Sequence, residues 1–568
     1  MNVYLKIVLC FSFFTTNQFA GFAQEKPAMF THADTLRGSD GPYRNWWNIL
    51  HYDLSVGFNI ADSSIAGLNI IQFKAITTGN KMQIDLQEPM VIDSVFVREN
   101  LQFKNSRLGT TQKYKVNARN IVKDGNAYFI LLNDTLQRNN IHYLFVYYHG
   151  KPKVAKRAPW DGGMVITTDS LKNPWISFAC QNTGASVWYP CKDHQADEAD
   201  SATMHISVPD SLVCVGNGRQ GPTKQNSNGT ATYTWTVKSP INNYNLVPYI
   251  GKYVHFSEDY KGEKGMLTMD FWALPYHLPQ AKKQFKDAAK MMKAFEHWFG
   301  AYPFYKDGYK LVEAPFLGME HQSGIAYGNE FLQGYLGRDL SGTGWGLNFD
   351  FIIVHESGHE WFGNNITTKD IADMWVHEGF TNYSETLFTE YYYGKNAGSD
   401  YVIGTRKNVA NDRPVIGAYH VQNEGSGDMY YKAGNMIHII RQLVNNDEKF
   451  RMLLRDMNRK FYQQTVTSSV VEQYITKYTG IDLSKIFDQY LRTIKIPVLE
   501  YKLEKNNLQY RYSNCVEGFT MPIKINLNGS MWIYPTNNWK SLKLTDTSEE
   551  ITFSVDRNFF VTVASRSL

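Results

Sequence analysis

The sequence predicts an α+β protein with several domains: a β-rich N-terminal region, a mostly helical middle region and a small β-rich C-terminal region. Residues 24–256 contain short runs in which apolar and polar side chains alternate, as in half-buried strands. Residues 257–497 instead carry apolar side chains three and four positions apart, the spacing of a helix face. Alternation returns in residues 498–568. The length of 568 residues fits this division, because a domain usually has about 100–200 residues.

The composition is that of a globular protein and excludes several classes. Hydrophobic residues make up 43% of the chain and charged residues 20%, which rules out a disordered, collagenous or coiled-coil protein as a whole. Aromatic residues reach 14%, which favours strands and broad packed surfaces. The 58 basic and 54 acidic residues leave a charge of only +4, so we expect no nucleic-acid partner.

The N-terminus has the pattern of a secretory signal. Lys6 precedes an apolar run over residues 7–14, and small residues stand at the −3 and −1 positions of a cleavage site that would end a signal peptide of residues 1–23. The alternative is a buried N-terminal segment. No other stretch has about 18 successive apolar residues, so we expect no stable membrane insertion after cleavage. The expected location is periplasmic or extracellular.

Cysteines are few after this segment. The remaining ones are Cys180, Cys191, Cys214 and Cys515, too few for a disulfide scaffold in a chain long enough to bury a core. Export would permit a bridge between Cys180 and Cys191, and two free buried thiols are the alternative.

The order of elements follows from local patterns. The clearest N-terminal strand has apolar residues at alternate positions: Tyr52, Leu54, Val56, Phe58 and Ile60. The middle region opens with a helical stripe that Gly300 ends: Ala281, Phe285, Ala288, Met292, Phe295 and Phe299. Further helices are expected over residues 350–362, 374–393, 428–445 and 468–492. In the C-terminal region, turns at Asn506-Asn507 and Asn528-Gly529 connect short strands and predict a small β-sandwich.

The strongest chemical signal is the motif His355-Glu356-Ser357-Gly358-His359. Two histidines four positions apart on a helix project from one face and can bind one metal ion. Glu356 beside them can take a proton from a water molecule that the metal activates. The alternative is a polar helix face with two unrelated histidines.

A catalytic zinc site needs a third protein ligand. A helix–turn–helix hairpin would bring Glu378 back over His355 and His359. His377 is a rival ligand one position away, but it would point about 100° round the helix from Glu378, so both cannot face the metal.

Residues 355–364 and 375–380 resemble the aminopeptidase N family of zinc metallopeptidases, whose signature is HExxH, eighteen residues, then Glu. His359 and Glu378 have eighteen residues between them. The resemblance implies a β saddle domain, a thermolysin-like catalytic domain and a small β-sandwich, without the large C-terminal helical domain of many members. It also implies one Zn²⁺ per chain and peptide substrates with a free N-terminus.

Three further segments resemble that family. Gly318, Met319 and Glu320 match the Gly-x-Met-Glu-Asn motif, in which the Glu binds the substrate's α-amine, although the Gly is displaced by one position. His321 stands where Asn is usual. Gln181 matches a residue that helps to hold the same amine, and a buried structural Gln is the alternative.

A last segment, residues 429–434, resembles the family stretch whose Tyr steadies the oxyanion. When Lys432 is matched to the Lys of that stretch, Tyr430 takes this role, and Tyr431 is the competitor. Ala433 replaces the usual Gly. A phenol can donate a hydrogen bond to a developing alkoxide.

These residues predict an exported zinc aminopeptidase with ligands His355, His359 and Glu378, general base Glu356 and oxyanion donor Tyr430. Glu320 and Gln181 would hold the amine. One rival is a zinc endopeptidase or a hydrolase of a non-peptide substrate such as an epoxide, and another is a non-catalytic binding protein on the same fold. The oligomeric state and the preferred N-terminal side chain are open.

Overall fold

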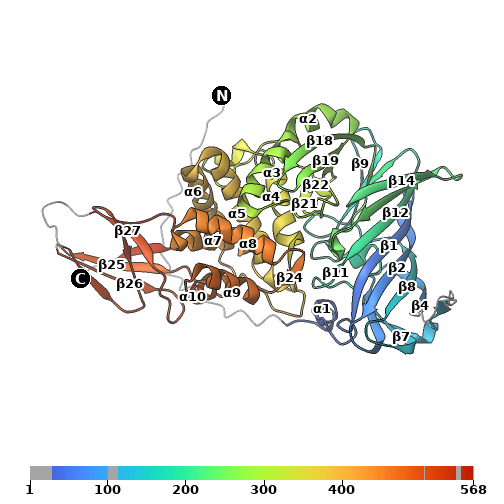
Figure 1. Ribbon diagram of the computed structural model, residues 1–568, viewed down its shortest axis with the longest axis horizontal. Coiled ribbons are helices and arrows are strands. Elements are labelled where there is room, and N and C mark those ends of the chain that lie inside the picture. The colour runs from blue at the N-terminus through green and yellow to red at the C-terminus, as the bar shows by residue number, and fades with distance from the viewer. Residues whose placement is uncertain (1–28, 100–112, 505, 545–551, 567–568) are drawn as a thin grey trace, which may run out of the picture.

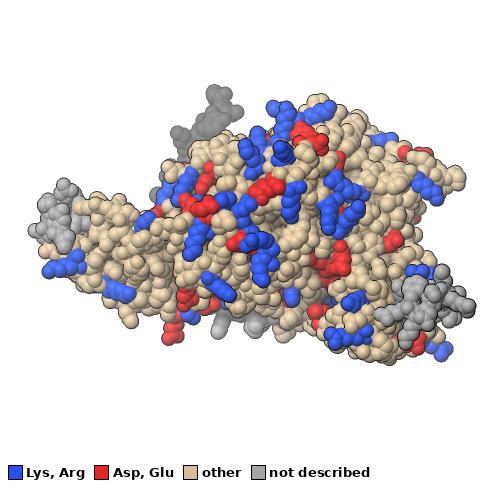
Figure 2. Space-filling model, viewed as in Figure 1, with Lys and Arg blue, Asp and Glu red and all other residues tan. Residues whose placement is uncertain are grey.

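The computed structural model describes residues 29–99, 113–504, 506–544 and 552–566. Figure 1 shows the N-terminal strands at one end of the molecule, the helices in the middle and the C-terminal strands at the other end. This arrangement confirms the predicted α+β multidomain fold. On the face shown in Figure 2, basic and acidic side chains are interspersed over the helical part.

The N-terminal part is built on an eight-stranded sheet in the order β14-β15-β12-β1-β2-β8-β4-β5. Side chains in β1 alternate between buried and partly exposed, as the period-2 pattern predicts, so one face of the sheet packs inward. The strands of this sheet are β1 (Trp47–Asn59), β2 (Ser64–Ala75), β4 (Val91–Glu99), β5 (Lys113–Lys115), β8 (Ile141–Gly150), β12 (Ser201–Pro209), β14 (Arg219–Gln225) and β15 (Thr230–Val237).

Smaller sheets share a hydrophobic core with this one, and the short helix α1 (His32–Gly38) precedes it. A three-stranded sheet contains β3 (Gly79–Asp85), β6 (Ile121–Asp124) and β7 (Ala127–Leu136). A four-stranded sheet contains β9 (Gly163–Thr168), β10 (Pro174–Ala179), β13 (Val213–Val215) and β17 (Tyr249–Gly251), and a two-stranded pair contains β11 (Glu198–Ala199) and β16 (Ile241–Asn242). Gln181 lies two residues after the end of β10, and its side chain contacts Glu320 in the next domain.

The middle part begins with a five-stranded sheet in the order β18-β19-β20-β22-β21. Its strands are β18 (Val254–Gly262), β19 (Gly265–Ala273), β20 (Tyr309–Glu313), β21 (Gly318–Met319) and β22 (Ile325–Tyr327). The predicted boundary at residues 256–257 falls inside β18. Strand β21 at the sheet edge contains Gly318 and Met319 of the expected substrate motif.

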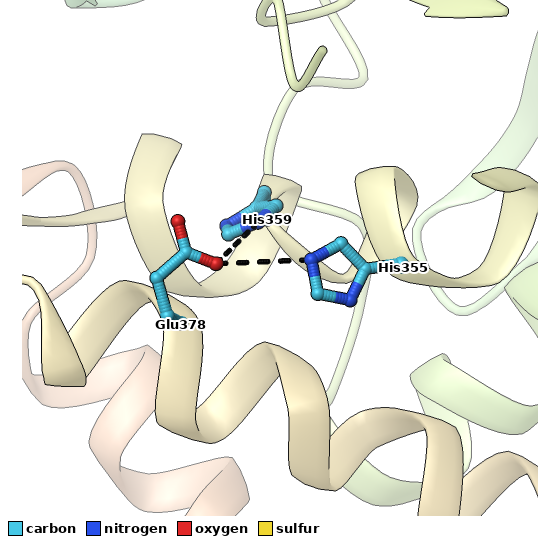
Figure 3. A group of neighbouring side chains, drawn as sticks. All are labelled: His355, His359 and Glu378. Carbon is cyan, nitrogen blue, oxygen red and sulfur yellow. Dashed lines mark ion pairs between the residues drawn. The ribbon is translucent and has the colours of Figure 1, made fainter. Parts of the chain in front are cut away.

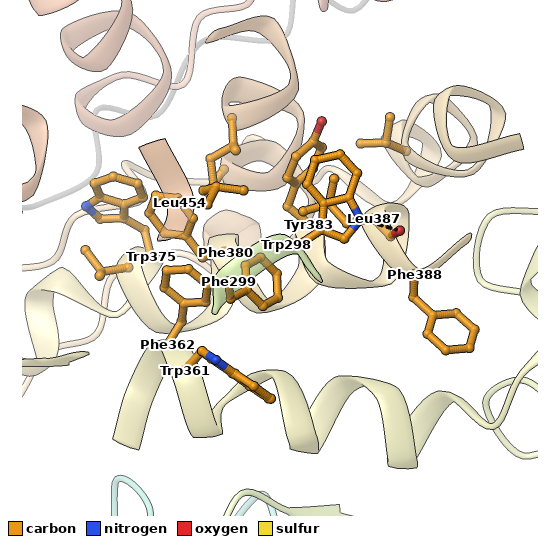
Figure 4. Packing of buried hydrophobic residues seen from close by; sticks show 14 of the residues in the cluster. Trp298, Phe299, Trp361, Phe362, Trp375, Phe380, Tyr383, Leu387, Phe388 and Leu454 are labelled. Atoms are coloured by element: carbon orange, nitrogen blue, oxygen red, sulfur yellow. Dashed lines mark hydrogen bonds between the residues drawn. The ribbon is translucent and has the colours of Figure 1, made fainter. Parts of the chain in front are cut away.

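Helices pack against this sheet and against one another. They are α2 (Leu278–Gln284), α3 (Lys286–Phe299), α4 (Phe351–Gly358), α5 (Trp375–Tyr393), α6 (Lys395–Gly404), α7 (Tyr431–Val444), α8 (Asp447–Lys460), α9 (Ser468–Thr479) and α10 (Ser484–Arg492). Figure 4 shows their core, where Phe299 of α3, Phe362 of the turn after α4, and Phe380 of α5 lie close together. The rings of Phe362 and Phe380 stack with centroids 4.7 Å apart.

Two of the expected helices are split. The apolar stripe from Ala281 to Phe299 is buried as predicted, but Phe285 ends α2 and begins α3, with a backbone ψ of −5°. Its ring packs against Phe271 and Tyr327 of the sheet, a constraint that residue spacing does not reveal. The predicted helix over residues 468–492 is broken at Gly480, which ends α9 in a left-handed conformation with φ 74°.

The connection between α4 and α5 also differs from the simple turn that we expected. A distorted π turn over residues 360–364 follows α4, and then β23 (Ile366–Thr368) pairs with β24 (Gln464–Val466). The two helices nevertheless pack together, so Glu378 reaches the two histidines.

The C-terminal part consists of two small sheets. One contains β25 (Val498–Glu504), β26 (Asn507–Ser513), β29 (Lys540–Lys543) and β31 (Thr562–Ser565), and the other β27 (Ile523–Leu527), β28 (Ser530–Ile533) and β30 (Phe553–Val555). The hairpin at Asn528-Gly529 is confirmed, because Asn526 pairs with Ser530 across it.

The predicted signal peptide, residues 1–23, lies outside the described residues. Within the described part of the chain no helix is long and apolar enough to cross a bilayer. Cys180 and Cys191 are both buried free thiols, so the structure agrees with the alternative of two unbridged cysteines.

Candidate metal centre and substrate site

A cavity of about 530 Å³ lies where the N-terminal β part meets the helical part. Its walls come from Gln181 and Asn182 after β10, from β21, α4 and α5, and from the loop that precedes α7. All nine residues predicted for the site line this cavity: Gln181, Gly318, Met319, Glu320, His355, Glu356, His359, Glu378 and Tyr430.

Three buried side chains in this cavity form a group that can hold a metal ion: His355, His359 and Glu378. Figure 3 shows both imidazoles facing the carboxylate. Glu378 Oε2 lies 3.3 Å from His359 Nε2 and 3.7 Å from His355 Nε2. This oxygen has no hydrogen-bond partner among the described residues, which is unusual for a buried carboxylate and fits a cation-binding role.

The charge distribution supports the same conclusion. Burial alone would raise the pKa of Glu378, but the adjacent His359 and His355 hold that pKa well below its usual range. The carboxylate is therefore ionised. The same attraction outweighs burial and raises the pKa of His359 to about 9, so a metal ion would have to displace the imidazole protons. Two deprotonated imidazoles and one carboxylate are a donor set that Zn²⁺ prefers, so these residues fit that ion.

The helix α4 positions both histidines through its two ends. Asp350 caps its first turn by accepting a hydrogen bond from the Ile353 backbone N–H, and its apolar first turn is buried. Beyond His359 the backbone leaves helical geometry, with φ −127° at Phe362 and φ 135° at Gly363. The Phe362 carbonyl oxygen then lies 3.0 Å from His359 Nδ1. An Nδ1–H that donates to this oxygen leaves Nε2 as the free donor atom for a metal.

Glu385 performs the same task for the other histidine, and the sequence analysis did not identify it. Its Oε1 lies 2.7 Å from His355 Nδ1 and its Oε2 accepts a hydrogen bond of 2.7 Å from Tyr401. The side chain is fully buried. Its position seven residues after Glu378, on the same face of one helix, is the signal that could have found it.

Glu356 lies in the cavity beside the metal group. Burial is the main cause that raises its pKa to about 7. Gly318 provides the space for this carboxylate, because a Cβ atom there would stand 2.8 Å from Glu356 Oε1. The displaced glycine of the motif thus has a steric role in this chain.

Glu320 is buried on the other side of the cavity and connects the two domains. Its Oε1 accepts hydrogen bonds from Gln181 Nε2 at 2.6 Å and from the Tyr244 hydroxyl at 2.9 Å. The backbone carbonyl of Glu320 accepts a third hydrogen bond from Asn364 at 2.8 Å. Tyr244 and Asn364 were not among the predicted site residues.

Both tyrosines of the segment before α7 line the cavity, but they lie differently. The Tyr430 ring stacks on the His355 ring with centroids 6.0 Å apart. Burial raises the pKa of Tyr430 well above its usual value, so the phenol keeps its proton and can donate a hydrogen bond. This placement favours Tyr430 over Tyr431 as the donor next to the metal group.

Comparison with known proteins agrees with this geometry. Residues 283–490 match the Peptidase family M1 domain and residues 48–244 match the Peptidase M1 N-terminal domain. The chain belongs to peptidase family M1. The family match covers both Gln181, which follows β10, and the segment that contains the metal group, so the site lies within the matched residues.

The relatives of this M1 peptidase are distant. A probable aminopeptidase 2 of Sulfurisphaera tokodaii is 21% identical over 72% of this chain and 52% of its own length. A leucyl aminopeptidase of Saccharolobus solfataricus is 22% identical over 63% of this chain and 47% of its own length. A leukotriene A-4 hydrolase of Xenopus laevis is 23% identical over 54% of this chain and 50% of its own length. The chain thus spans about half the length of the curated relatives it matches.

A solved structure supports the M1 fold as well. The M1 zinc metallopeptidase from Deinococcus radiodurans superposes with a TM-score of 0.65 at 19% identity, covering 81% of this chain and 96% of that one.

Apart from the displaced Gly318, the unusual residues that this M1 chain has in or beside the family motifs do not line the cavity. His321 is fully buried and its Nδ1 lies 2.6 Å from the Tyr249 hydroxyl. His377, the rival metal ligand, turns away and accepts a hydrogen bond of 2.8 Å from the Thr368 backbone N–H. Ala433 packs against Gly379 of α5, where a Cβ atom would approach it to 2.8 Å.

Proposed function

We propose that this chain is a zinc-dependent aminopeptidase that removes the N-terminal residue from peptides. One observation carries the proposal: the buried carboxylate of Glu320 lies in the same cavity as the metal group formed by His355, His359 and Glu378. A carboxylate at this place can pair with a substrate ammonium and so select chain ends.

The metal group would hold one Zn²⁺, which polarises a carbonyl and lowers the pKa of water. Glu356 accepts the proton of the attacking water and passes it to the leaving amine, a task that suits a pKa of about 7. The Tyr430 hydroxyl donates a hydrogen bond to the developing oxyanion. Glu320, oriented by Gln181 and Tyr244, anchors the α-amine one residue from the cleaved bond.

We also propose that the protein is exported to the periplasm or the extracellular space. The support is the basic residue, apolar run and small residues within positions 1–23. A fusion of these residues to a reporter enzyme that functions only after export tests this proposal, and a reporter that stays in the cytoplasm contradicts it.

The decisive experiment compares one short peptide in free and N-acetylated form, with and without a zinc chelator. The proposal expects stepwise cleavage of the free form only, and loss of cleavage on chelation. Equal cleavage of the acetylated form would indicate an endopeptidase. Zinc binding without cleavage of either form would favour a non-peptide hydrolase or a binding protein.

A further inference from the structure

Glu424 is the one carboxylate of the cavity for which the proposed mechanism has no use. Among the residues that the structure describes, five glutamates line the cavity: Glu320, Glu356, Glu378, Glu385 and Glu424. The first four anchor the amine, take the proton, bind the metal and orient His355. Glu424 is half-buried and lies in the loop before Tyr430.

No lysine or arginine is among the described residues that line this cavity. Arg413 makes no ion pair with Glu424 among the described contacts, and burial raises the pKa of Glu424 by more than the distant Arg413 lowers it. The Arg413 guanidinium instead pairs with Asp412 at 2.9 Å and donates to the Gly425 carbonyl at 2.7 Å and 3.0 Å. Glu424 is therefore left without a cation of its own in the described part of the chain.

The proposed ligands bring no positive charge for Glu424. The metal group would take the divalent ion, and Glu320 would take the substrate ammonium. A carboxylate in such a position attracts a second positive charge on the ligand.

Asn182 places Glu424 beside the amine anchor. Its Nδ2 donates to Glu424 Oε2 at 2.5 Å, and the preceding residue, Gln181, donates to Glu320. The Asn182 carbonyl accepts hydrogen bonds from Arg37 and from Gln422. Glu424 is thus held next to the part of the cavity that receives the first residue of a substrate.

We propose that Glu424 makes the cavity selective for a basic first residue, so that preferred substrates are peptides that begin with Arg or Lys. The inference rests on the proposed aminopeptidase function. Glu424 would pair with the side-chain cation while Glu320 pairs with the α-ammonium, and Asn182 would position Glu424 for this role.

The test measures kcat/KM for peptides that differ only in the first residue: Arg, Lys, citrulline, and Leu. Citrulline has the shape of arginine without its charge. The wild-type protein is expected to prefer Arg over citrulline by at least roughly tenfold, because a hydrogen bond between charged groups stabilises more than one to a neutral group. Glu424→Gln should lose roughly 10- to 100-fold on Arg and Lys, but less than about threefold on Leu.

Two variants serve as references. Glu330→Gln removes an exposed carboxylate that lines a different cavity and should leave all four rates unchanged. Asn182→Gly removes the donor to Glu424 and tolerates the left-handed φ of 61° at this position, so it should lower the Arg preference without abolishing it.

Binding provides a readout that needs no turnover. In the Glu356→Gln background, calorimetry should show tighter binding of arginine amide than of citrulline amide, and Glu424→Gln should remove the difference. Cleavage of the Leu peptide without any preference for Arg over citrulline overturns the role of Glu424 but leaves the aminopeptidase proposal intact. An equal loss on all four peptides in Glu424→Gln also overturns it, and cleavage of none of them overturns both.

Discussion

Gln181, which follows strand β10 of the N-terminal β part, donates a hydrogen bond of 2.6 Å to Glu320, which follows strand β21 of the helical part. The proposed amine anchor is therefore shared between two domains. The metal group, by contrast, belongs wholly to α4, α5 and the residue that follows α4. Substrate binding and metal binding can be disturbed separately, and the predictions below use this separation.

Gln181→Ala should weaken the amine anchor without disturbing zinc. Glu320 would lose a charge-assisted hydrogen bond, so kcat/KM for a free peptide should fall roughly tenfold, mostly through KM. Steady-state kinetics and zinc content measure both quantities. Gln137→Ala, on an exposed loop of the same domain, is the control. Unchanged kinetics in Gln181→Ala would assign the residue a purely structural role.

Glu356→Gln should abolish turnover while zinc stays bound. The amide keeps the shape of the side chain but cannot accept the proton, and general bases contribute about 10²- to 10⁴-fold. Elemental analysis should find one zinc per chain in the variant, as in the wild-type protein. Full activity in this variant would exclude Glu356 as the base.

Tyr430→Phe and Tyr431→Phe should separate the two tyrosines of the cavity. Loss of a hydrogen bond to the oxyanion costs about 10²- to 10³-fold in kcat, and this loss is expected for Tyr430 with KM little changed. Tyr431→Phe should reduce kcat less than about threefold. The reverse order of effects would transfer the role to Tyr431.

Glu385→Gln should weaken zinc binding although Glu385 is not a ligand. The carboxylate fixes the orientation of His355 through a contact of 2.7 Å, and loss of such a partner costs about 10- to 100-fold in metal affinity. Competition with a chromogenic chelator measures this change. Excess zinc should restore most of the activity, which separates this variant from Glu356→Gln. Tyr401→Phe removes only a donor to Glu385 and should show a smaller effect in the same direction.

Glu198, which does not line the cavity, should make the stability of the fold depend on pH. Burial raises its pKa to about 7, and its Oε1 has no hydrogen-bond partner among the described residues. The folded state therefore binds a proton that the unfolded chain releases, so this group destabilises the fold progressively as the pH rises from about 4.5 to 7.

Glu198→Gln cannot ionise and removes this effect. Its melting temperature should exceed that of the wild-type protein by roughly 2–6 °C at pH 8, and the two should nearly coincide at pH 5. Differential scanning calorimetry at both pH values decides the matter, with the exposed Asp259→Asn as a control that should show no such divergence. A stabilisation equal at both pH values would contradict the assignment to Glu198 ionisation.

The metal group could be predicted from the sequence because its geometry is mostly local. His355 and His359 lie on one helix face by their spacing, and Glu378 stands at a characteristic interval from them. The rest of the site depends on contacts that no local pattern encodes. Tyr244 reaches Glu320 from a separate β segment, and the hydrogen bond from Asn182 to Glu424 joins two loops of different domains.

Prediction of the fold from the sequence has the same limit, because only local patterns can be recognised. Alternation predicted β1, and the Asn528-Gly529 turn predicted its hairpin, because each depends on neighbouring residues. The break at Phe285 was missed because the sheet beneath it, not the helix itself, determines where the chain turns.

The spacing of these contacts along the chain suggests an order in which the site is completed. His355 and Glu385 are 30 positions apart, whereas Gln181 and Glu320 are 139 apart and Asn182 and Glu424 are 242 apart. Contacts between distant positions cost more loop-closure entropy and tend to form late in folding. The helical part can therefore assemble its histidine and carboxylate cluster first. A chain caught at that stage would take up metal but could not yet distinguish one peptide from another.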